Sequence, residues 1–163
     1  MPSMYLLRHG IAEDHAPSAN GGFDDSQRAL TKEGIKKTGK VIARLGQTGI
    51  KVSRILTSPL LRAQQTAELL NKAFPAPVLL LEELSPTYTP IELLSALQNL
   101  PHEDNTCLVG HEPLLSTFTS LLISGSPACS IDLKKAGFIG LSFQKLRAHH
   151  ATLTHLIPPK ILI

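Results

Sequence analysis

A layered α/β fold with a mostly parallel central sheet is predicted by three features of this sequence. Short apolar runs of strand length alternate with longer segments of helical periodicity. Helix start signals and turn residues separate these segments, and no internal repeat or low-complexity block interrupts them. The 163 residues, 42% of them hydrophobic, suit one compact core. We therefore expect a single domain over residues 1–163, with helices flanking the sheet in a three-layer arrangement.

The first strand is expected at residues 4–7, and the first helix within residues 30–49, with Thr31 as its N-cap. Between them, the polar and glycine-rich residues 13–27 have almost no periodicity and predict a long loop. One face of the helix carries five residues at helical spacing, which should be buried: Ile35, Thr38, Val41, Ile42 and Leu45.

A second strand is expected at residues 52–58, followed by a helix over residues 58–74. Ser58 can cap this helix, and Pro59 suits its first position because proline has no N–H to leave unsatisfied there. Four apolar residues support the helix: Leu61, Ala67, Leu70 and Phe74. The next apolar run, residues 77–82, predicts a third strand.

The second half of the chain repeats the alternation. Residues 89–100 open on Thr-Pro and predict a helix, a fourth strand ends at Val109, and another helix begins at about Pro113. Two further strands and an apolar tail that should pack on the body close the chain: residues 137–143, 151–157 and 157–163.

Composition excludes several classes of function. The net charge is only +3, with Lys and Arg scattered, so the sequence lacks the footprint of a nucleic-acid-binding protein. No stretch approaches the ~20 apolar residues of a membrane span, and the N-terminus has no targeting pattern. Cys107 and Cys129 lack metal-site or disulfide spacing and are expected to be buried free thiols. We expect a soluble, cytoplasmic protein without a cofactor.

Three polar residues follow three of the predicted strands directly. His9 follows the first strand, Ser58 the second and His111 the fourth. In open α/β sheets, ligands bind outside the carboxyl ends of the strands, so these side chains should converge. Arg8 precedes His9, and Gly10 is expected to adopt a backbone conformation closed to other residues, which would turn both side chains into one pocket.

Arg62 lies near the start of the predicted 58–74 helix, whose N-terminal dipole favours an anion. Each of these residues alone also fits a purely structural role. Four segments taken in chain order are more specific: "LLRHG", "RALTKEG", "ILTSPLLRAQQTA" and "VGHEPLLS". With these, the chain resembles the histidine phosphatase superfamily, which has the phosphoglycerate mutase-like fold, over roughly residues 4–123. It lacks an inserted cap domain and is similar to the small SixA-type phosphohistidine phosphatases.

The resemblance implies that His9 is the nucleophile that accepts the phosphoryl group, and that Arg8, Arg62 and His111 surround it. Arg28 matches a substrate-binding arginine of small members. Because neutral imidazole is nucleophilic, His9 needs no metal, provided that its other nitrogen is held, most simply by a backbone carbonyl in the Gly10 turn. The expected function is a metal-independent phosphatase that removes phosphate from phosphohistidine on a partner protein.

Other interpretations remain open. A broad phosphomonoesterase or pyrophosphatase acting on small phosphorylated metabolites would use the same site, and a non-catalytic phosphoprotein-binding module would use its arginines alone. The general acid is Glu82, Glu83 or neither of them. A phosphohistidine substrate can react without such an acid, because imidazole leaves more readily than an alcohol. Lys134 and Lys135 border the pocket or simply cap a strand end. A metal site is not expected, since the histidines have no recognisable ligand spacing.

Overall fold

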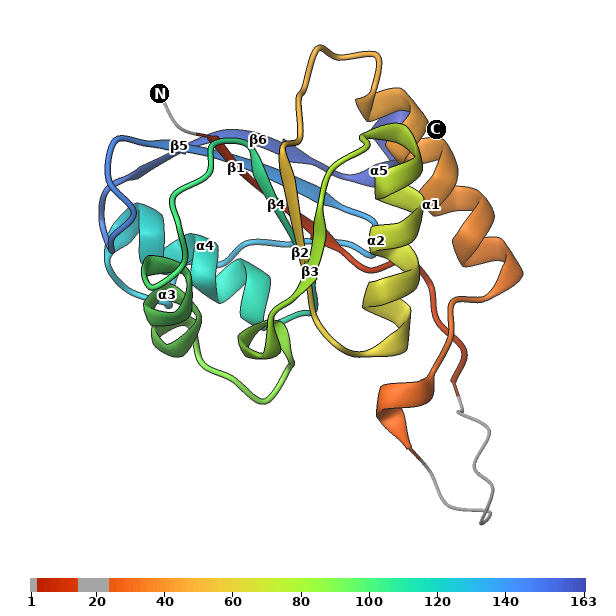
Figure 1. Cartoon of the computed structure of the whole chain (residues 1–163), viewed down its shortest axis with the longest axis horizontal. Coiled ribbons are helices and arrows are strands. Elements are labelled where there is room, and N and C mark those ends of the chain that lie inside the picture. Colours follow the sequence, from red (N-terminus) through yellow and green to blue (C-terminus); the bar gives the residue numbers. More distant parts are fainter. Residues whose placement is uncertain (1–2, 15–23) are drawn as a thin grey trace.

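The computed structural model describes residues 3–14 and 24–163, and six strands within them form one sheet (Figure 1). Their bounds are Ser3–Arg8 (β1), Arg54–Thr57 (β2), Val78–Leu80 (β3), Thr106–Gly110 (β4), Phe138–Phe143 (β5) and Ala151–Ile157 (β6). Their order across the sheet is β3-β2-β4-β1-β5-β6. The first four strands pair in parallel, whereas β5 is antiparallel to both β1 and β6. The predicted mostly parallel sheet is confirmed.

Helices cover both faces of this sheet, which confirms the predicted three layers. On one face lie α1 (Lys32–Leu45), α2 (Leu61–Ala73) and the short α5 (Pro159–Leu162), and on the other lie α3 (Pro90–Gln98) and α4 (Leu114–Ser124) (Figure 1). Two 3-10 helices, η1 (Asp25–Gln27) and η2 (Glu82–Leu84), complete the elements. No helix in the described ranges combines the length and the apolar character needed to cross a bilayer.

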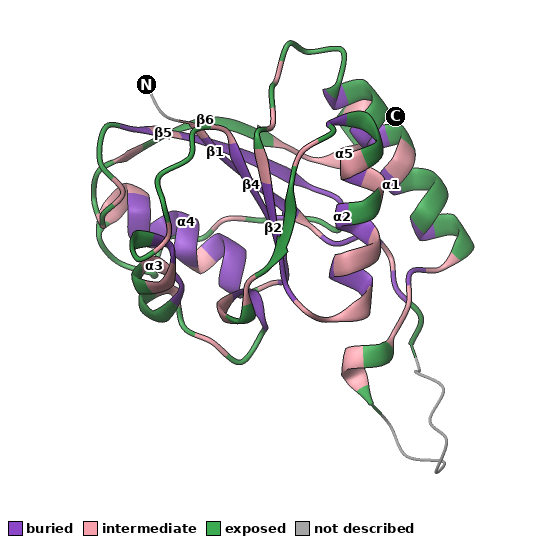
Figure 2. Cartoon of the chain, in the orientation of Figure 1, coloured by how far each residue is buried: buried purple, intermediate pink, exposed green. Residues whose placement is uncertain are grey.

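The core has two halves because neighbouring residues of a strand point to opposite faces. In β1, Met4 and Leu6 pack in a cluster with Phe118 of α4, whereas Tyr5 and Leu7 pack in a second cluster with residues of α1 and α2. Figure 2 accordingly shows buried central strands and an exposed β3 at one edge. Packing on both faces therefore fixes the positions of the central strands and of their carboxyl ends.

The first helix differs from the prediction in its buried face. Ile35 is 44% exposed, and the buried residues are Gly34, Thr38, Val41, Ile42 and Leu45. Gly34 begins this stripe because α1 packs so closely on the chain after β1 that a Cβ there would overlap the Ile11 carbonyl oxygen. Ile35 lies one position further, about 100° around the helix, and therefore faces away from the core.

Other local predictions have mixed outcomes. The N-cap of α2 is Leu60, not Ser58, although the Ser58 hydroxyl does accept a hydrogen bond from the Leu60 N–H. Cys107 is buried as expected, but Cys129 is exposed. Most of the predicted 13–27 loop, residues 15–23, lies outside the described residues. The C-terminal tail packs on the body as α5, where Arg44 Nε donates to the Leu162 carbonyl.

Candidate active site

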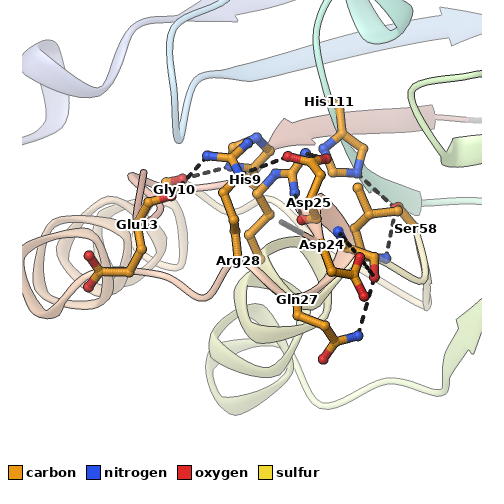
Figure 3. Close-up of polar contacts among 12 residues, drawn as sticks. His9, Gly10, Glu13, Asp24, Asp25, Gln27, Arg28, Ser58 and His111 are labelled. Carbon is orange, nitrogen blue, oxygen red and sulfur yellow. Dashed lines mark hydrogen bonds and ion pairs between the residues drawn. The ribbon is translucent and has the colours of Figure 1, made fainter. Parts of the chain in front are cut away.

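Three parallel strands place the candidate site at one edge of the sheet. β1 ends at Arg8, β2 at Thr57 and β4 at Gly110, so His9, Ser58 and His111 each follow a strand end directly. The His9 N–H donates to the Gly110 carbonyl at 3.0 Å. The rings of His9 and His111 lie 5.1 Å apart between centroids (Figure 3). The expected convergence of residues distant in sequence is present.

His9 is held in one orientation by its own turn. Its Nδ1 lies 2.7 Å from the Gly10 carbonyl oxygen, and because a carbonyl only accepts, Nδ1 must carry the proton. Nε2 therefore keeps its lone pair. Burial, together with the charges of Arg62, Arg8 and Lys135, lowers the pKa of His9 to about 4, against the opposing effect of the Gly10 hydrogen bond. The ring is neutral at neutral pH.

Gly10 is required for space rather than for an unusual backbone conformation. Among the described glycines, positive φ angles occur at Gly49 and Gly125, so the expected conformational reason at Gly10 is wrong. A Cβ at Gly10 would instead overlap Thr38 Oγ1 of α1. The Gly10 N–H also donates to Thr66 Oγ1 of α2 at 3.2 Å. The turn is thus clamped between two helices.

The guanidinium groups of Arg8 and Arg62 are held by hydrogen bonds to different parts of the chain. Arg8, the last residue of β1, donates from one terminal nitrogen to the Leu133 carbonyl at 2.8 Å. Arg62, in the first turn of α2 and only 4% exposed, donates to the Asp25 carbonyl at 2.9 Å and to the Asp25 carboxylate at 3.1 Å. The Nε of each arginine is buried and has no partner among the described residues. Each arginine therefore holds an unused donor.

Asp25 also organises Arg28, and sequence reasoning did not identify it. Its second carboxylate oxygen accepts from Arg28 Nε at 2.8 Å, so one carboxylate joins two guanidiniums (Figure 3). Although burial raises the pKa of Asp25, hydrogen bonds from Arg28 and Arg62 hold it below its ordinary value. The spacing of Asp25 and Arg28 by three residues was the available signal, since a short helical turn brings such a pair together.

Ser58 holds His111 through one of its ring nitrogens. His111 Nε2 lies 2.8 Å from Ser58 Oγ, and the same Oγ accepts from the Leu60 N–H at 3.1 Å. The Ser58 proton can therefore point at His111 Nε2, which leaves the proton of the imidazole on Nδ1. That Nδ1 is buried and has no partner among the described residues. Burial, with the neighbouring His9, Arg62 and Arg8, lowers the pKa of His111 to about 3, against the opposing charge of Asp25.

All five site residues expected from the sequence line one cavity of about 320 Å³. Its lining consists of Arg8, His9, Ala12, Asp25, Arg28, Arg62, Pro86, His111, Glu112 and Lys135. We call it the catalytic cavity. Neither Glu82 nor Glu83 is among these residues, and of the two lysines only Lys135 lines it, whereas Lys134 pairs with Asp132 at 3.1 Å. Within the described ranges, no group of three or more His, Cys, Asp or Glu side chains is arranged to hold a metal ion.

The comparisons with known proteins decide the family. A model of branch 1 of the histidine phosphatase superfamily matches residues 4–86, just over half of the chain. The chain belongs to this superfamily. Within it, the phosphohistidine phosphatase SixA of Escherichia coli is 32% identical over 127 residues, which cover 75% of this chain and 74% of SixA. An uncharacterized protein of Picosynechococcus is 38% identical over 151 residues, covering 90% of this chain and 89% of that protein.

A comparison with a solved structure shows that the similarity covers the whole fold. The protein histidine phosphatase SixA complexed with tungstate has a TM-score of 0.81 and 26% sequence identity, and the match covers 99% of both chains. The fold is thus the phosphoglycerate mutase-like fold of SixA. In this member of the superfamily, the unused donors on Arg8, Arg62 and His111 suit a tetrahedral oxyanion, since guanidinium and imidazole N–H groups bind such oxygens strongly.

Proposed function

We propose that this histidine phosphatase removes phosphate from phosphohistidine on a partner protein, with His9 as the nucleophile. The observation that carries the proposal is the hydrogen bond from His9 Nδ1 to the Gly10 carbonyl. It selects the tautomer whose Nε2 has a free lone pair, inside a cavity that also holds Arg8 and Arg62. A neutral imidazole in this position can form a covalent phosphoryl intermediate without a metal ion.

The reaction consists of two displacements at phosphorus. In the first, His9 Nε2 bonds to phosphorus while the bond to the substrate imidazole breaks, and its electron pair stays on the substrate nitrogen. In the second, water attacks phosphorus, the electron pair of the Nε2–P bond returns to His9, and a proton of the water passes to the departing phosphate. Arg8, Arg62 and His111 donate hydrogen bonds to the phosphoryl oxygens, which is where such reactions gain most of their acceleration.

The state of the carboxylates in the catalytic cavity favours phosphohistidine over an ester. An alkoxide leaving group needs a proton from an acid, whereas an imidazole whose other nitrogen is protonated leaves as a neutral molecule. Asp25 accepts hydrogen bonds from two guanidiniums and its pKa is lowered, so it is a poor proton donor. Both oxygens of Glu112 accept from Ser116 at the start of α4. The similarity to SixA, named a phosphohistidine phosphatase, supports the same substrate class.

Hydrolysis of two substrates side by side tests the proposal. One is a protein phosphorylated on histidine with phosphoramidate, and the other is glycerol 2-phosphate, an alkyl ester whose alkoxide leaving group needs a proton. We expect kcat/KM to be at least about tenfold higher for the phosphoprotein, because only this leaving group needs no acid. Activity should survive dialysis against a chelator.

Three outcomes would contradict the proposal. A preference for the ester would favour the phosphomonoesterase, and loss of activity in chelator that a divalent ion restores would indicate a metal enzyme. Tight phosphoprotein binding without turnover would favour the binding module.

A further inference from the structure

A second cavity, of about 510 Å³, lies beside the catalytic cavity and shares Arg8 and Lys135 with it. The two cavities are therefore neighbours, with these two side chains at their common boundary. Its walls come from the chain after β1, from α1, from the segment before β5 and from the C-terminal helix α5, which packs beside α1 (Figure 1). No step of the proposed hydrolysis uses this cavity.

The lining of this second cavity is apolar inside and basic at its edge. Apolar walls are provided by Ile11, Ala136, Pro159 and Ile163, and four lysines border it: Lys37, Lys134, Lys135 and Lys160. None of its described lining residues is acidic, in contrast to the catalytic cavity with Asp25 and Glu112. Lysine stems cover apolar surface while the ammonium groups stay in water. We call this feature the lysine-rimmed cavity.

Not all of the four positive charges are free. Lys37 pairs with Glu33 of the same helix at 2.8 Å, and Lys134 pairs with Asp132 at 3.1 Å. Both side chains of each pair are exposed, so water screens the attraction between them. An incoming carboxylate can therefore compete for the ammonium group. Lys135 and Lys160 have no ion pair with any described residue. The rim therefore keeps a net positive field.

We propose that the lysine-rimmed cavity binds the substrate protein next to its phosphohistidine, by taking an apolar side chain that acidic residues flank. This inference rests on the proposed function. A protein that places phosphohistidine in the catalytic cavity brings its adjacent surface close to the second one, because the two cavities are neighbours that share Arg8 and Lys135. The apolar walls are complementary to an aliphatic or aromatic side chain, and the lysines to Asp and Glu around it.

Peptides with one phosphohistidine test this recognition directly. The first carries Leu and two Asp beside the phosphohistidine, the second has Ser for Leu, and the third has Lys for both Asp. We expect kcat/KM for the first to exceed that for the second by about tenfold, the size of effect that burying one aliphatic side chain produces. It should also exceed that for the third, whose lysines meet the rim lysines as like charges. Free phosphohistidine reports the chemistry without the docking.

Two variants assign the preference to the cavity. K37Q/K160Q should lower kcat/KM for the Asp-containing peptide about fivefold, as expected for two exposed charge pairs. I163S should reduce the advantage of Leu over Ser. Turnover of free phosphohistidine should stay unchanged in both. The matched control is K51Q/K72Q, since both lysines are exposed and outside the cavity.

The possible outcomes separate the inference from the proposed function. If the wild type hydrolyses all three peptides equally, or K37Q/K160Q behaves as the control does, the lysine-rimmed cavity is not a docking site, although the enzyme remains a phosphohistidine phosphatase. If no phosphohistidine substrate is hydrolysed while esters are, the proposed function fails and the inference with it. Melting curves for each variant distinguish lost recognition from lost folding.

Discussion

The two neighbouring cavities hold their charged groups in opposite ways. In the catalytic cavity, each charged or titratable group with a proposed role is anchored: His9 to Gly10, Arg8 to Leu133, Arg62 to Asp25, and His111 to Ser58. In the lysine-rimmed cavity, exposed lysines border apolar walls. Anchored groups suit a transition state whose geometry never varies, and flexible ones suit a partner surface that does. Changes in the first should therefore lower kcat on every substrate, and changes in the second should alter only recognition.

The largest effect is expected from His9→Ala, which removes the nucleophile and with it the covalent route. Activity on both phosphohistidine and esters should fall by about 10⁴-fold or more, as for nucleophiles of other enzymes. Radiolabelled substrate should leave an acid-labile, alkali-stable label on the wild type and none on the variant. His102→Ala is a matched control, because His102 is exposed, pairs with Asp104 and lies outside the catalytic cavity. Residual activity within tenfold of the wild type would mean that another group attacks phosphorus.

Loss of Arg62 should rank second. Arg62→Ala removes one anchored donor, and the expected loss in kcat is about 10²- to 10³-fold, the cost of deleting one oxyanion donor. Arg62→Lys should recover only part of this, because an ammonium group cannot hold Asp25 and a phosphoryl oxygen with the same planar geometry. Arg54→Lys, at the opposite end of β2, should be unaffected. A change confined to KM would place Arg62 in recognition instead.

Much of this catalytic geometry could be predicted from the sequence, and the reason is local. His9 and His111 follow short apolar runs whose length favours buried strands, so their place at the carboxyl edge follows from parallel topology. The position of Arg62 near the site can be predicted because its helix starts directly after another of these strands.

The parts that could not be predicted depend on contacts between elements distant in the chain. Asp25 lies in a segment without periodicity, and its partner Arg62 is 37 positions away. The steric need for Gly10 arises from Thr38 on α1, and the exposure of Ile35 follows from how closely α1 approaches Ile11. Nothing in the sequence pattern sets these distances.

A moderate effect is expected from Ser58→Ala, which tests whether orientation of His111 matters as much as its presence. Without the Ser58 hydroxyl, the Nδ1–H tautomer of His111 loses its support, and kcat should fall by about tenfold, the value of one neutral hydrogen bond. The ¹⁵N chemical shifts of His111 should show the proton moving from Nδ1 to Nε2 in part of the population. An unchanged tautomer together with unchanged kcat would reduce Ser58 to holding the Leu60 N–H before α2, and a melting curve would reveal that smaller cost.

The smallest effect is expected from mild acidification, and this test shows whether water is excluded from the catalytic cavity. Because the pKa of His9 is about 4 and that of His111 about 3, both rings stay neutral well below 6.5, the ordinary value for histidine. After correction for the protonation of the substrate's own imidazole, measured on the free substrate, the single-turnover rate of His9 phosphorylation should thus change less than about twofold between pH 7 and pH 5. Stability behaves differently. As pH falls through 6.5, both histidines take up protons in the unfolded chain but not in the folded one, so the free energy of unfolding decreases from there down to about pH 4 for His9 and about pH 3 for His111. A phosphorylation rate that already halves at pH 6.5 would mean that water reaches His9, and the contrast between an anchored, desolvated cavity and an exposed one would no longer hold.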